Sequence, residues 1–268
     1  MTDLQIGVVG CAGRMGISLL RQIHATEGCA ISGGSERPGH GDVGRDLGEL
    51  AGLETLGLAV EADPRAMFTK AQIVLDFTVP AATVAHTALA VETDTMLVIG
   101  TTGTTPEDDA AIRTAANSVA IMREGNMSLG VNVLAVLVER MASYLDNEFD
   151  IEIVEMHHRY KVDAPSGTAL LLGRAAAAGR GIDHETVRQG GREGITGERR
   201  RGDIGYAALR GGNVAGEHTV IFAADDERVE LSHKATDRTI FARGALRAAR
   251  WLANKDAGLY GMADVLGL

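Results

Sequence analysis

The chain has 268 residues, of which 45% are hydrophobic, and this is enough for two modest domains or one large one. Its formal net charge of −10 argues against a nucleic-acid partner, because phosphate backbones are bound by basic surfaces. The spacing of Cys11 and Cys29 matches no metal or disulfide framework, and we find neither a signal peptide nor an apolar run of membrane-spanning length. We therefore expect a cytoplasmic protein that does not bind membranes.

The first half of the chain alternates between buried-strand and helix patterns. Apolar runs and helical spacing of apolar residues predict strands over 4–9, 30–33, 73–77, 96–99 and 119–122 and helices over 14–24, 81–90 and 106–117. Strands separated by helices, without tight hairpins, indicate parallel βαβ units with right-handed crossovers. The predicted fold class is α/β, with a Rossmann-type parallel sheet in a dinucleotide-binding domain.

The pattern changes after a predicted helix over 132–145. From residue 150 onward the strands alternate apolar and polar residues, which is typical of an open, mixed or largely antiparallel sheet with one covered face. A helix over 166–179 and an aperiodic loop over 182–203 interrupt this sheet, and a final helix over 239–254 is expected to return to the first domain. We therefore predict a dinucleotide-binding domain at 1–128 and 238–268 and a smaller α+β domain for the substrate at 129–237.

A glycine-rich stretch follows the first predicted strand and opens the first helix. It reads Gly10-Cys11-Ala12-Gly13-Arg14-Met15-Gly16. A tight turn of this kind lets a pyrophosphate approach the backbone, and the amides at the start of the helix point toward it. Ala12 stands where the usual G-x-G-x-x-G pattern has its second glycine, but the position after strand one favours a nucleotide site over a simple turn.

The acidic residue Glu36 lies three residues beyond the second predicted strand. Glu36 lies 20 residues beyond Gly16, about where a carboxylate accepts hydrogen bonds from the ribose of an adenosine. Arg37 could stack on adenine and contact a 2′-phosphate, so the pair could admit both NADH and NADPH. The structural alternative is a solvated pair of loop residues.

Two further loops follow predicted strands at the edge where ligands of such folds bind. One contains Gly100, Thr101 and Thr102, and the other contains Glu124, Gly125, Asn126 and Met127. Small residues and backbone groups there could contact the nicotinamide end of the cofactor. Taken singly, each loop is more often only a turn, and Glu124 would repel a cofactor phosphate if it faced inward.

The densest cluster of reactive residue types lies between Glu155 and Ala169, where an alternating strand ends. His157 and His158 would point to opposite faces of a continuing strand, so the chain must leave the sheet for both to reach one ligand. Lys161 would then come from the same loop. Ser166 is a plausible helix N-cap. The amides of Gly167 and Thr168 would lie in the first helical turn, where they could hold a carboxylate. The segment thus offers a general acid or base, a cation and an anion hole for one small acidic molecule.

Two other interpretations of this segment compete with an acid–base site. The paired histidines and Glu155 could be zinc ligands, but their spacing matches none of the usual zinc motifs and a third neutral ligand is missing, so no metal is expected. The histidines could also be structural groups satisfied at a strand end.

These residues resemble those of a known family, the 4-hydroxy-tetrahydrodipicolinate (dihydrodipicolinate) reductases. The resemblance rests on the pattern H-H-x-x-K-x-D-x-P-S-G-T-A from His157, on the glycine-rich stretch and on Asn126 to Asn132. It continues through Arg210-Gly211-Gly212, Gly216 to Val220 and Phe241 to Ala245, and so covers essentially the whole chain.

The resemblance implies NADH- or NADPH-dependent reduction of 4-hydroxy-tetrahydrodipicolinate to tetrahydrodipicolinate, with loss of water, in the diaminopimelate route to lysine. It makes His157 the proton donor or acceptor and Lys161 the second catalytic group. The implied contacts to the carboxylates of the small dicarboxylate substrate are His158, Gly167 and Thr168. The family is typically a homotetramer that assembles through the sheet of the second domain.

Two other classes of protein remain open on the residues alone. One is a different Rossmann dehydrogenase, acting on an amino-acid aldehyde or a sugar, which would not need paired histidines joined to Ser-Gly-Thr. The other is a non-catalytic nucleotide sensor that keeps the glycine-rich stretch and Glu36. The presence of both His157 and Lys161 argues against the sensor.

Overall fold

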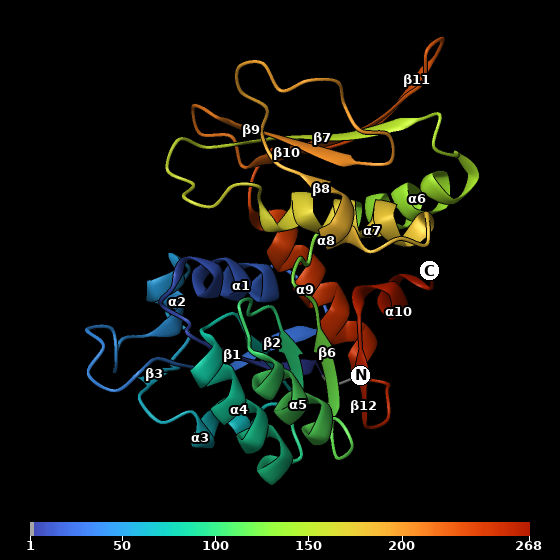
Figure 1. The fold of residues 1–268 in the computed structure, drawn as a ribbon. Helices are drawn as coiled ribbons and strands as arrows, with labels where there is room; N and C mark the ends of the chain where they lie inside the picture. The colour runs from blue at the N-terminus through green and yellow to red at the C-terminus, as the bar shows by residue number, and fades with distance from the viewer. Residues whose placement is uncertain (1–2) are drawn as a thin grey trace. The chain divides into compact units, whose positions relative to one another are not determined.

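A computed structural model describes residues 3–268 (Figure 1). The chain divides into two compact units. The first contains the chain up to Ser128 together with Thr239–Gly267, and the second contains Leu129–Arg238 and Leu268. Within residues 3–268, no helix has the length and apolar character needed to cross a membrane.

The first unit is built on a seven-stranded sheet in the order β12-β6-β5-β4-β1-β2-β3. All six neighbouring pairs run parallel, which confirms the predicted α/β class. The strands are β1 Leu4–Val9, β2 Cys29–Ser35, β3 Val60–Glu61, β4 Ile73–Asp76, β5 Met96–Ile99, β6 Ala120–Arg123 and β12 Gly258–Tyr260. The chain moves outward from β1 in both directions, so β1 and β4 flank the switch point where ligands of such sheets bind.

The helices of this unit include four of ten or more residues and three short ones. They are α1 Arg14–His24, α2 Leu47–Ala51, α3 Arg65–Phe68, α4 Pro80–Thr93, α5 Pro106–Ala115, α9 Thr239–Leu252 and α10 Met262–Leu266. The sequence did not predict α2, α3, α10, β3 or β12, because two to five residues are too few to establish a hydrophobic period. Helix α9 packs against α1 and against β5 and β6.

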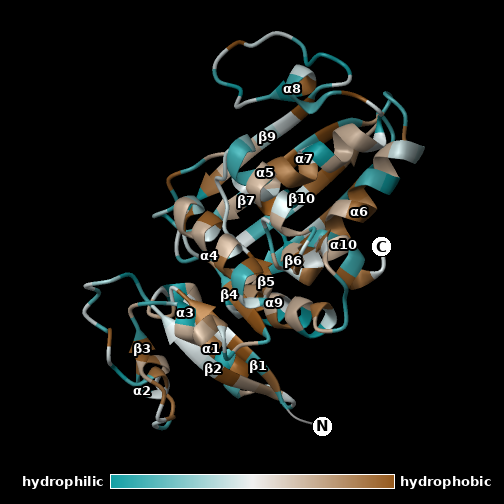
Figure 2. Ribbon diagram, turned by 90° about the horizontal axis from the view of Figure 1, so that it is seen from below, coloured by the Kyte–Doolittle hydropathy of each residue, from teal (hydrophilic) through white to brown (hydrophobic). Residues whose placement is uncertain are grey.

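The core of the first unit explains why its strands are apolar throughout. Helices cover a parallel sheet on both faces, so consecutive residues of a strand are buried. Ile73, Val74 and Leu75 of β4 are all completely buried, as are Leu97 and Ile99 of β5. Figure 2 shows β1 and β5 coloured largely as hydrophobic.

The second unit contains a five-stranded sheet in the order β11-β10-β7-β9-β8. Its strands are β7 Asp150–His157, β8 Arg188–Gln189, β9 Ile204–Arg210, β10 Gly216–Ala223 and β11 Arg228–Ala235. Strand β10 runs antiparallel to β7 and β11, whereas β9 runs parallel to β7 and β8. The sheet is therefore mixed, and the expectation of a largely antiparallel sheet holds for only half of its pairs. The reason is that a crossover containing helix α7 (Gly167–Gly179) joins β7 to β9.

Helices α6 (Leu129–Tyr144) and α7 pack against each other and cover one face of this sheet (Figure 1). On β7 the buried face carries Ile151 and Ile153 and then two ionisable residues, Glu155 and His157. Burying a carboxyl and an imidazole side by side costs free energy unless they are paired, so this end of the strand marks a candidate site.

The segment predicted as a loop over 182–203 is only partly irregular. It contains the one-turn helix α8 (His184–Val187) and strand β8, both too short for a sequence signal. Arg192 and Arg199 each donate hydrogen bonds to the carboxylate of Glu152 on β7. Burial raises the pKa of Glu152, but the two guanidinium groups outweigh this effect and hold the pKa below its usual range. The loop is thereby fixed to the sheet.

Candidate functional site

The glycine-rich stretch forms a close turn between β1 and α1. Gly10 has a φ of +66°, a left-handed conformation that favours glycine. A Cβ added at Gly16 would lie 2.3 Å from the carbonyl oxygen of Gly10 and 2.5 Å from that of Cys11, so helix and turn touch through backbone atoms. This cradle fits the pyrophosphate of a dinucleotide, which needs close backbone approach at a helix N-terminus.

The side chain of Cys11 points away from such a ligand. It is fully buried, and burial raises the pKa of its thiol to about 12. The Cys11 amide donates to the carbonyl oxygen of Ser35 over 3.1 Å, which ties the turn to β2. Cys11 and Cys29 are both free and buried, as expected for small core residues.

Glu36, just after β2, lies against the glycine-rich turn. Its Oε1 accepts a hydrogen bond of 3.1 Å from the Ala12 amide, and its Oε2 accepts one of 3.2 Å from the Arg37 amide. The structure therefore brings Glu36 to the turn, which spacing alone only suggested. Arg37 is exposed, and no ion pair of its side chain occurs within the described residues.

The loops after β5 and β6 share the carboxyl edge of the sheet with this turn. Thr101 is buried, accepts a hydrogen bond from Thr83 over 2.8 Å and donates one to Asp76 at the end of β4 over 3.4 Å. A Cβ added at Gly100 would overlap the ring of Phe77. Residues 76–78, at the end of β4 and just after it, thus lie among the predicted cofactor residues, although the sequence analysis did not point to them. The polar pair Asp76 and Thr78 at the end of a buried strand was the available signal.

The carboxylate of Glu124 is held by backbone amides. Its Oε1 accepts from the Gly125 amide over 3.0 Å, and its Oε2 accepts from the Met262 amide, at the start of α10, over 3.3 Å. Met127 is buried, and Asn126 accepts a hydrogen bond from the Ser128 amide over 2.9 Å. The carboxylate therefore stabilises the loop and a helix N-terminus.

In the second unit, His157 is the last residue of β7, and its side chain is 10% exposed. Its Nδ1 lies 2.6 Å from Oε2 of Glu155. Burial lowers the pKa of His157, and Lys161 and Arg210 lower it further, whereas the Glu155 carboxylate limits the fall. The chain leaves the sheet at this point, as the sequence analysis required.

Glu155 has four hydrogen-bond donors around it. Arg210 donates to both of its oxygens, over 2.7 and 2.9 Å, and the Ser166 amide donates to Oε1 over 3.0 Å. Burial raises the pKa of Glu155, but the bonds from Arg210, His157 and Ser166 outweigh this effect, so the pKa lies below its usual range. Arg210 stands opposite His157 in the β7–β9 register. The sequence assigned no acid–base role to Glu155 or to Arg210, although it placed His157 in the site.

A second buried histidine, His218 on β10, lies beside His157. The two ring centroids are 5.1 Å apart, with the planes inclined by 74°. Nε2 of His218 lies 3.1 Å from Oγ of Ser166, and burial lowers the pKa of His218 to about 4. His218 is therefore neutral at neutral pH and contributes shape and hydrogen bonding to the site rather than charge.

The predicted cation, Lys161, is paired in the structure. Its Nζ donates to Oδ1 of Asp163 over 2.8 Å, and this bond lowers the pKa of Asp163. His158 follows His157 out of the sheet, and its amide donates to the carbonyl oxygen of Val214 over 2.8 Å. Nδ1 of His158 is buried without a hydrogen-bond partner among the residues described. His158 thus keeps one polar atom without a hydrogen bond within the described residues.

The N-terminus of α7 closes the segment. Ser166 is the N-cap, as predicted, and its Oγ accepts from the Ala169 amide over 3.2 Å. Gly167 and Thr168 form the first helical turn, and a Cβ added at Gly167 would meet no atom within 4 Å. The backbone at Gly167 is therefore open to a ligand, as an anion-binding helix N-terminus requires.

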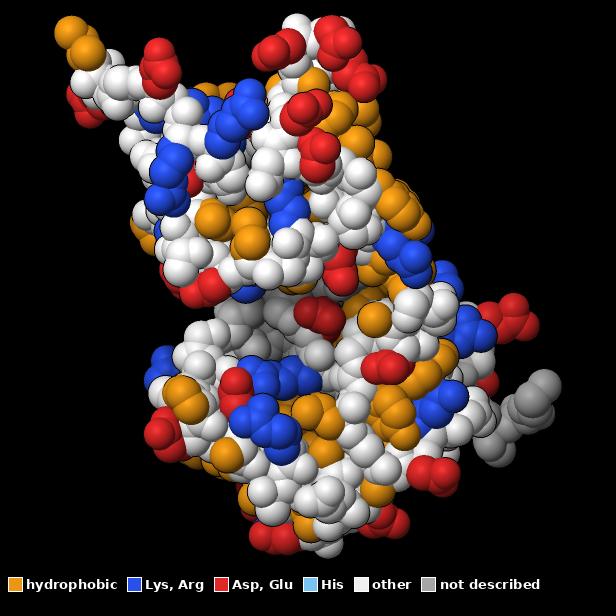
Figure 3. All heavy atoms as spheres, turned by 45° about the vertical axis from the view of Figure 1, so that its right-hand side comes forward, with side chains coloured by type: hydrophobic (Ala, Val, Ile, Leu, Met, Phe, Trp, Pro, Cys, Tyr) orange, Lys and Arg blue, Asp and Glu red, His pale blue; other side chains and the backbone are white. Residues whose placement is uncertain are grey.

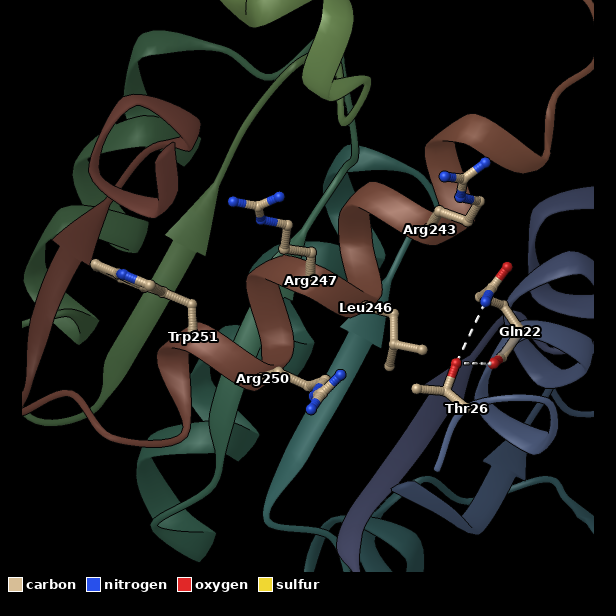
Figure 4. Close-up of a pocket in the computed structure, with 7 residues that line it drawn as sticks. All are labelled: Gln22, Thr26, Arg243, Leu246, Arg247, Arg250 and Trp251. Atoms are coloured by element: carbon tan, nitrogen blue, oxygen red, sulfur yellow. Dashed lines mark hydrogen bonds between the residues drawn. The ribbon is translucent and has the colours of Figure 1, made fainter. Parts of the chain in front are cut away.

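A shallow groove elsewhere in the first unit does not belong to the predicted cofactor site. Figure 4 shows the residues that line it: Gln22, Thr26, Arg243, Leu246, Arg247, Arg250 and Trp251. Gln22 is more than two turns along α1 from Arg14, where the glycine-rich stretch ends.

Acidic and basic side chains are interspersed over most of the face drawn in Figure 3. Among residues 3–268, no group of three metal-ligating side chains is arranged to hold an ion.

A glycine-rich turn on a doubly wound parallel sheet, joined to a unit with a buried imidazole–carboxylate pair, defines the class of nicotinamide-dependent oxidoreductases. Comparison with known proteins shows which family of this class the chain belongs to. Residues 4–127 match the family model "Dihydrodipicolinate reductase, N-terminus", and residues 130–266 match "Dihydrodipicolinate reductase, C-terminus". The chain belongs to the dihydrodipicolinate reductase family, which confirms the resemblance found in the sequence.

Individual relatives agree with this assignment. The chain is 57% identical to the 4-hydroxy-tetrahydrodipicolinate reductase of Parvibaculum lavamentivorans, over 99% of this chain and 98% of that protein. It is 56% identical to the enzyme of the same name from Rhodopseudomonas palustris strain BisA53, over 100% and 98% of the two chains. Among solved structures, the dipicolinate-bound dihydrodipicolinate reductase from Paenisporosarcina sp. TG-14 superposes with a TM-score of 0.75 at 25% identity, covering 98% of this chain and 99% of that one.

Proposed function

We propose that the protein reduces 4-hydroxy-tetrahydrodipicolinate to tetrahydrodipicolinate, with loss of water, in the diaminopimelate route to lysine. The observation that carries this proposal is the segment from Glu155 to Thr168, which joins a carboxylate-bound imidazole, a lysine and an open helix N-terminus. The first unit would bind the dinucleotide and the second the substrate. Hydride transfer requires the two ligands to meet during turnover.

The chemistry of the reaction accounts for these residue types. Loss of the 4-hydroxyl as water from the cyclic imine leaves a conjugated ring. The nicotinamide cofactor supplies a hydride to C4 of that ring, and the resulting electron-rich system then takes one proton. Protonated His157 gives this proton, while Lys161 holds and polarises the substrate. Overall, one hydride and one proton are added and one water is lost.

The two carboxylates of the substrate need separate partners. We assign them to His158 and to the amides of Gly167 and Thr168 at the N-terminus of α7. The structurally similar protein from Paenisporosarcina binds dipicolinate, a planar dicarboxylate, which supports a dicarboxylate as ligand here. A different substrate for a Rossmann dehydrogenase would not require two anion contacts in one segment.

The decisive assay follows oxidation of NADH and NADPH at 340 nm with freshly generated 4-hydroxy-tetrahydrodipicolinate. We expect turnover with at least one cofactor and none when the substrate is replaced by aspartate semialdehyde. Folded protein that binds NADH but does not turn over 4-hydroxy-tetrahydrodipicolinate with either cofactor would instead be a nucleotide sensor.

Replacement of Lys161 by Ala is expected to lower kcat and raise KM for the substrate, each by about tenfold. Both parameters change because the ammonium group binds a carboxylate or imine in the ground state and stabilises charge in the transition state. Steady-state kinetics check this, with Lys70→Ala, which removes an exposed lysine of the first unit, as the control. A change in KM alone would limit Lys161 to binding.

For the cofactor, we propose that the protein uses NADH and NADPH, with Glu36 at the adenosine ribose and Arg37 at the 2′-phosphate. Arg37→Ala is expected to raise KM for NADPH by about tenfold or more, because a charge-assisted phosphate contact is lost, and to leave KM for NADH within about twofold. The matched control is Arg65→Ala, which removes another exposed arginine of the first unit. Equal effects on the two cofactors would exclude a 2′-phosphate contact.

We further propose that the protein is a cytoplasmic homotetramer assembled through the sheet of the second unit. The face of this sheet opposite α6 and α7 carries partly exposed apolar residues such as Leu209, which is 51% exposed in the single chain. Light scattering of the purified protein is expected to give four times the chain mass. A monomer that retains full activity would refute the assembly as a requirement for function.

A further inference from the structure

The carboxylate of Glu155 is buried and fully hydrogen-bonded. It is 1% exposed, and it accepts hydrogen bonds from His157, from two nitrogens of Arg210 and from the Ser166 amide. Two carboxylate oxygens offer about four lone-pair positions, so no acceptor position is left for a substrate. Glu155 therefore acts on the reaction only through the groups that it holds.

An ionised carboxylate is an acceptor only, so the nitrogen that faces it must carry a proton. The bond of 2.6 Å from Nδ1 of His157 therefore fixes the neutral ring as the Nδ1–H tautomer. Nε2 then holds the lone pair of neutral His157 and the transferable proton of the imidazolium. When Nε2–H gives its proton to the reduced substrate, the ring returns to its neutral Nδ1–H form.

We propose that Glu155, anchored by Arg210 and the Ser166 amide, is a positioning residue that keeps a proton on Nδ1 of His157 and thereby reserves Nε2 for proton transfer to the substrate. The role of Nε2 in proton transfer rests on the proposed function, whereas the tautomer of His157 rests only on its bond to Glu155. It assigns the same supporting role to Arg210, whose guanidinium fork binds both carboxylate oxygens.

The surroundings of Nε2 agree with this division of roles. Glycine at position 216 leaves this nitrogen uncovered, because a Cβ there would lie 3.0 Å from Nε2. The titratable groups around the ring are Glu155 on β7, Arg210 on β9, His218 on β10 and Lys161 from the loop. His218 is neutral, and Lys161 and Arg210 are cations that disfavour a charged ring, so Glu155 is the only one of these groups that stabilises the imidazolium.

The variant Glu155→Gln tests the inference. The amide oxygen would keep the bonds from Ser166 and from one nitrogen of Arg210, and the bond from the other nitrogen would be lost. The amide NH₂ would face Nδ1, which must then accept, so the proton of the neutral ring would shift to Nε2. We expect ¹⁵N NMR of the histidine rings, recorded without substrate, to show Nδ1–H for His157 in the native protein and Nε2–H in the variant. We expect kcat to fall about 10²-fold with KM within about threefold.

Three comparisons separate positioning from a general structural effect. In a His157→Gln background, Glu155→Gln is expected to cost less than about twofold more in kcat, because its route of action is gone. In the single variant, the fall of kcat/KM with rising pH is expected at lower pH, because the imidazolium has lost its carboxylate. Glu155→Asp, which restores the charge, is expected to recover part of the activity. Glu152→Gln, which neutralises another arginine-bound carboxylate on the same strand, is expected to leave the His157 tautomer unchanged.

Several outcomes would overturn the inference. They are an unchanged tautomer in folded Glu155→Gln, an equal loss of kcat with and without His157, or a pH profile that does not move. Thermal unfolding and NADH binding establish whether the variant folds. If it does not, Arg210→Gln keeps the carboxylate but removes its anchor, and unchanged kcat in that variant would equally refute the proposal. Native protein that shows the Nδ1–H tautomer but no turnover would refute the proposed reaction and leave the tautomer assignment standing.

Discussion

Replacement of His157 by Gln is expected to lower kcat by about 10²- to 10⁴-fold, which is the usual contribution of general acid catalysis. Glutamine preserves hydrogen bonding and much of the side-chain volume but cannot deliver a proton near neutral pH. KM for the substrate is expected to change by less than about threefold, because the carboxylate contacts assigned to His158 and α7 remain. Steady-state kinetics with both cofactors measure the two parameters separately.

The control for this variant is His24→Gln, which changes an exposed histidine at the end of α1. It is expected to leave both parameters unchanged. Full activity of the His157 variant would remove His157 from the chemistry altogether. A rise of KM without a fall of kcat would instead make it a binding residue.

Gly16→Ala is expected to lower cofactor affinity by more than about tenfold and the melting temperature by about 5 °C or more. The added methyl group would meet backbone atoms, the carbonyl oxygens of Gly10 and Cys11, rather than a flexible side chain. The turn must therefore move away from α1, and the amides that we propose to bind the pyrophosphate would move with it. Fluorescence titration with NADH and thermal unfolding measure the two effects.

The matched control is Gly41→Ala in the same unit, where an added Cβ meets no atom within 4 Å. This variant is expected to keep both affinity and stability. If Gly16→Ala lost stability but bound NADH as well as the native protein, the glycine-rich turn would be structural only.

Sequence patterns predicted most of the first unit because its signals are local. The long helices and buried strands have clear periods, and the glycine-rich stretch, Glu36 and the loop containing Thr101 each follow a strand directly. The short elements β3, α2 and β12 lack enough residues for such a period. Their positions depend on which edge of the sheet remains to be paired, and this is a tertiary property.

The site in the second unit was predictable only along one segment. His157, Lys161 and Ser166 lie within ten residues of one another, so their grouping was visible. Arg210 is 55 residues from Glu155, and His218 is 52 residues from Ser166. Their approach depends on the parallel register of β7 with β9 and on the antiparallel register of β7 with β10, which join strands far apart in the sequence. Composition also gave no sign that Lys161 would pair with Asp163.

The discontinuity of the first unit determines the order in which the protein is completed during synthesis. Helix α9 and strand β12 come from the end of the chain, and α9 contributes fully buried residues such as Ala245 and Ala249 to a core that the N-terminal residues began. The second unit is continuous from Leu129 to Arg238 and leaves the ribosome whole, whereas the first waits, with an unpaired edge on β6, for the last thirty or so residues. The first unit therefore cannot be completed until α9 and β12 have been synthesised. This delay is a vulnerability to premature termination, because a chain that stops before Thr239 lacks the helix that covers α1.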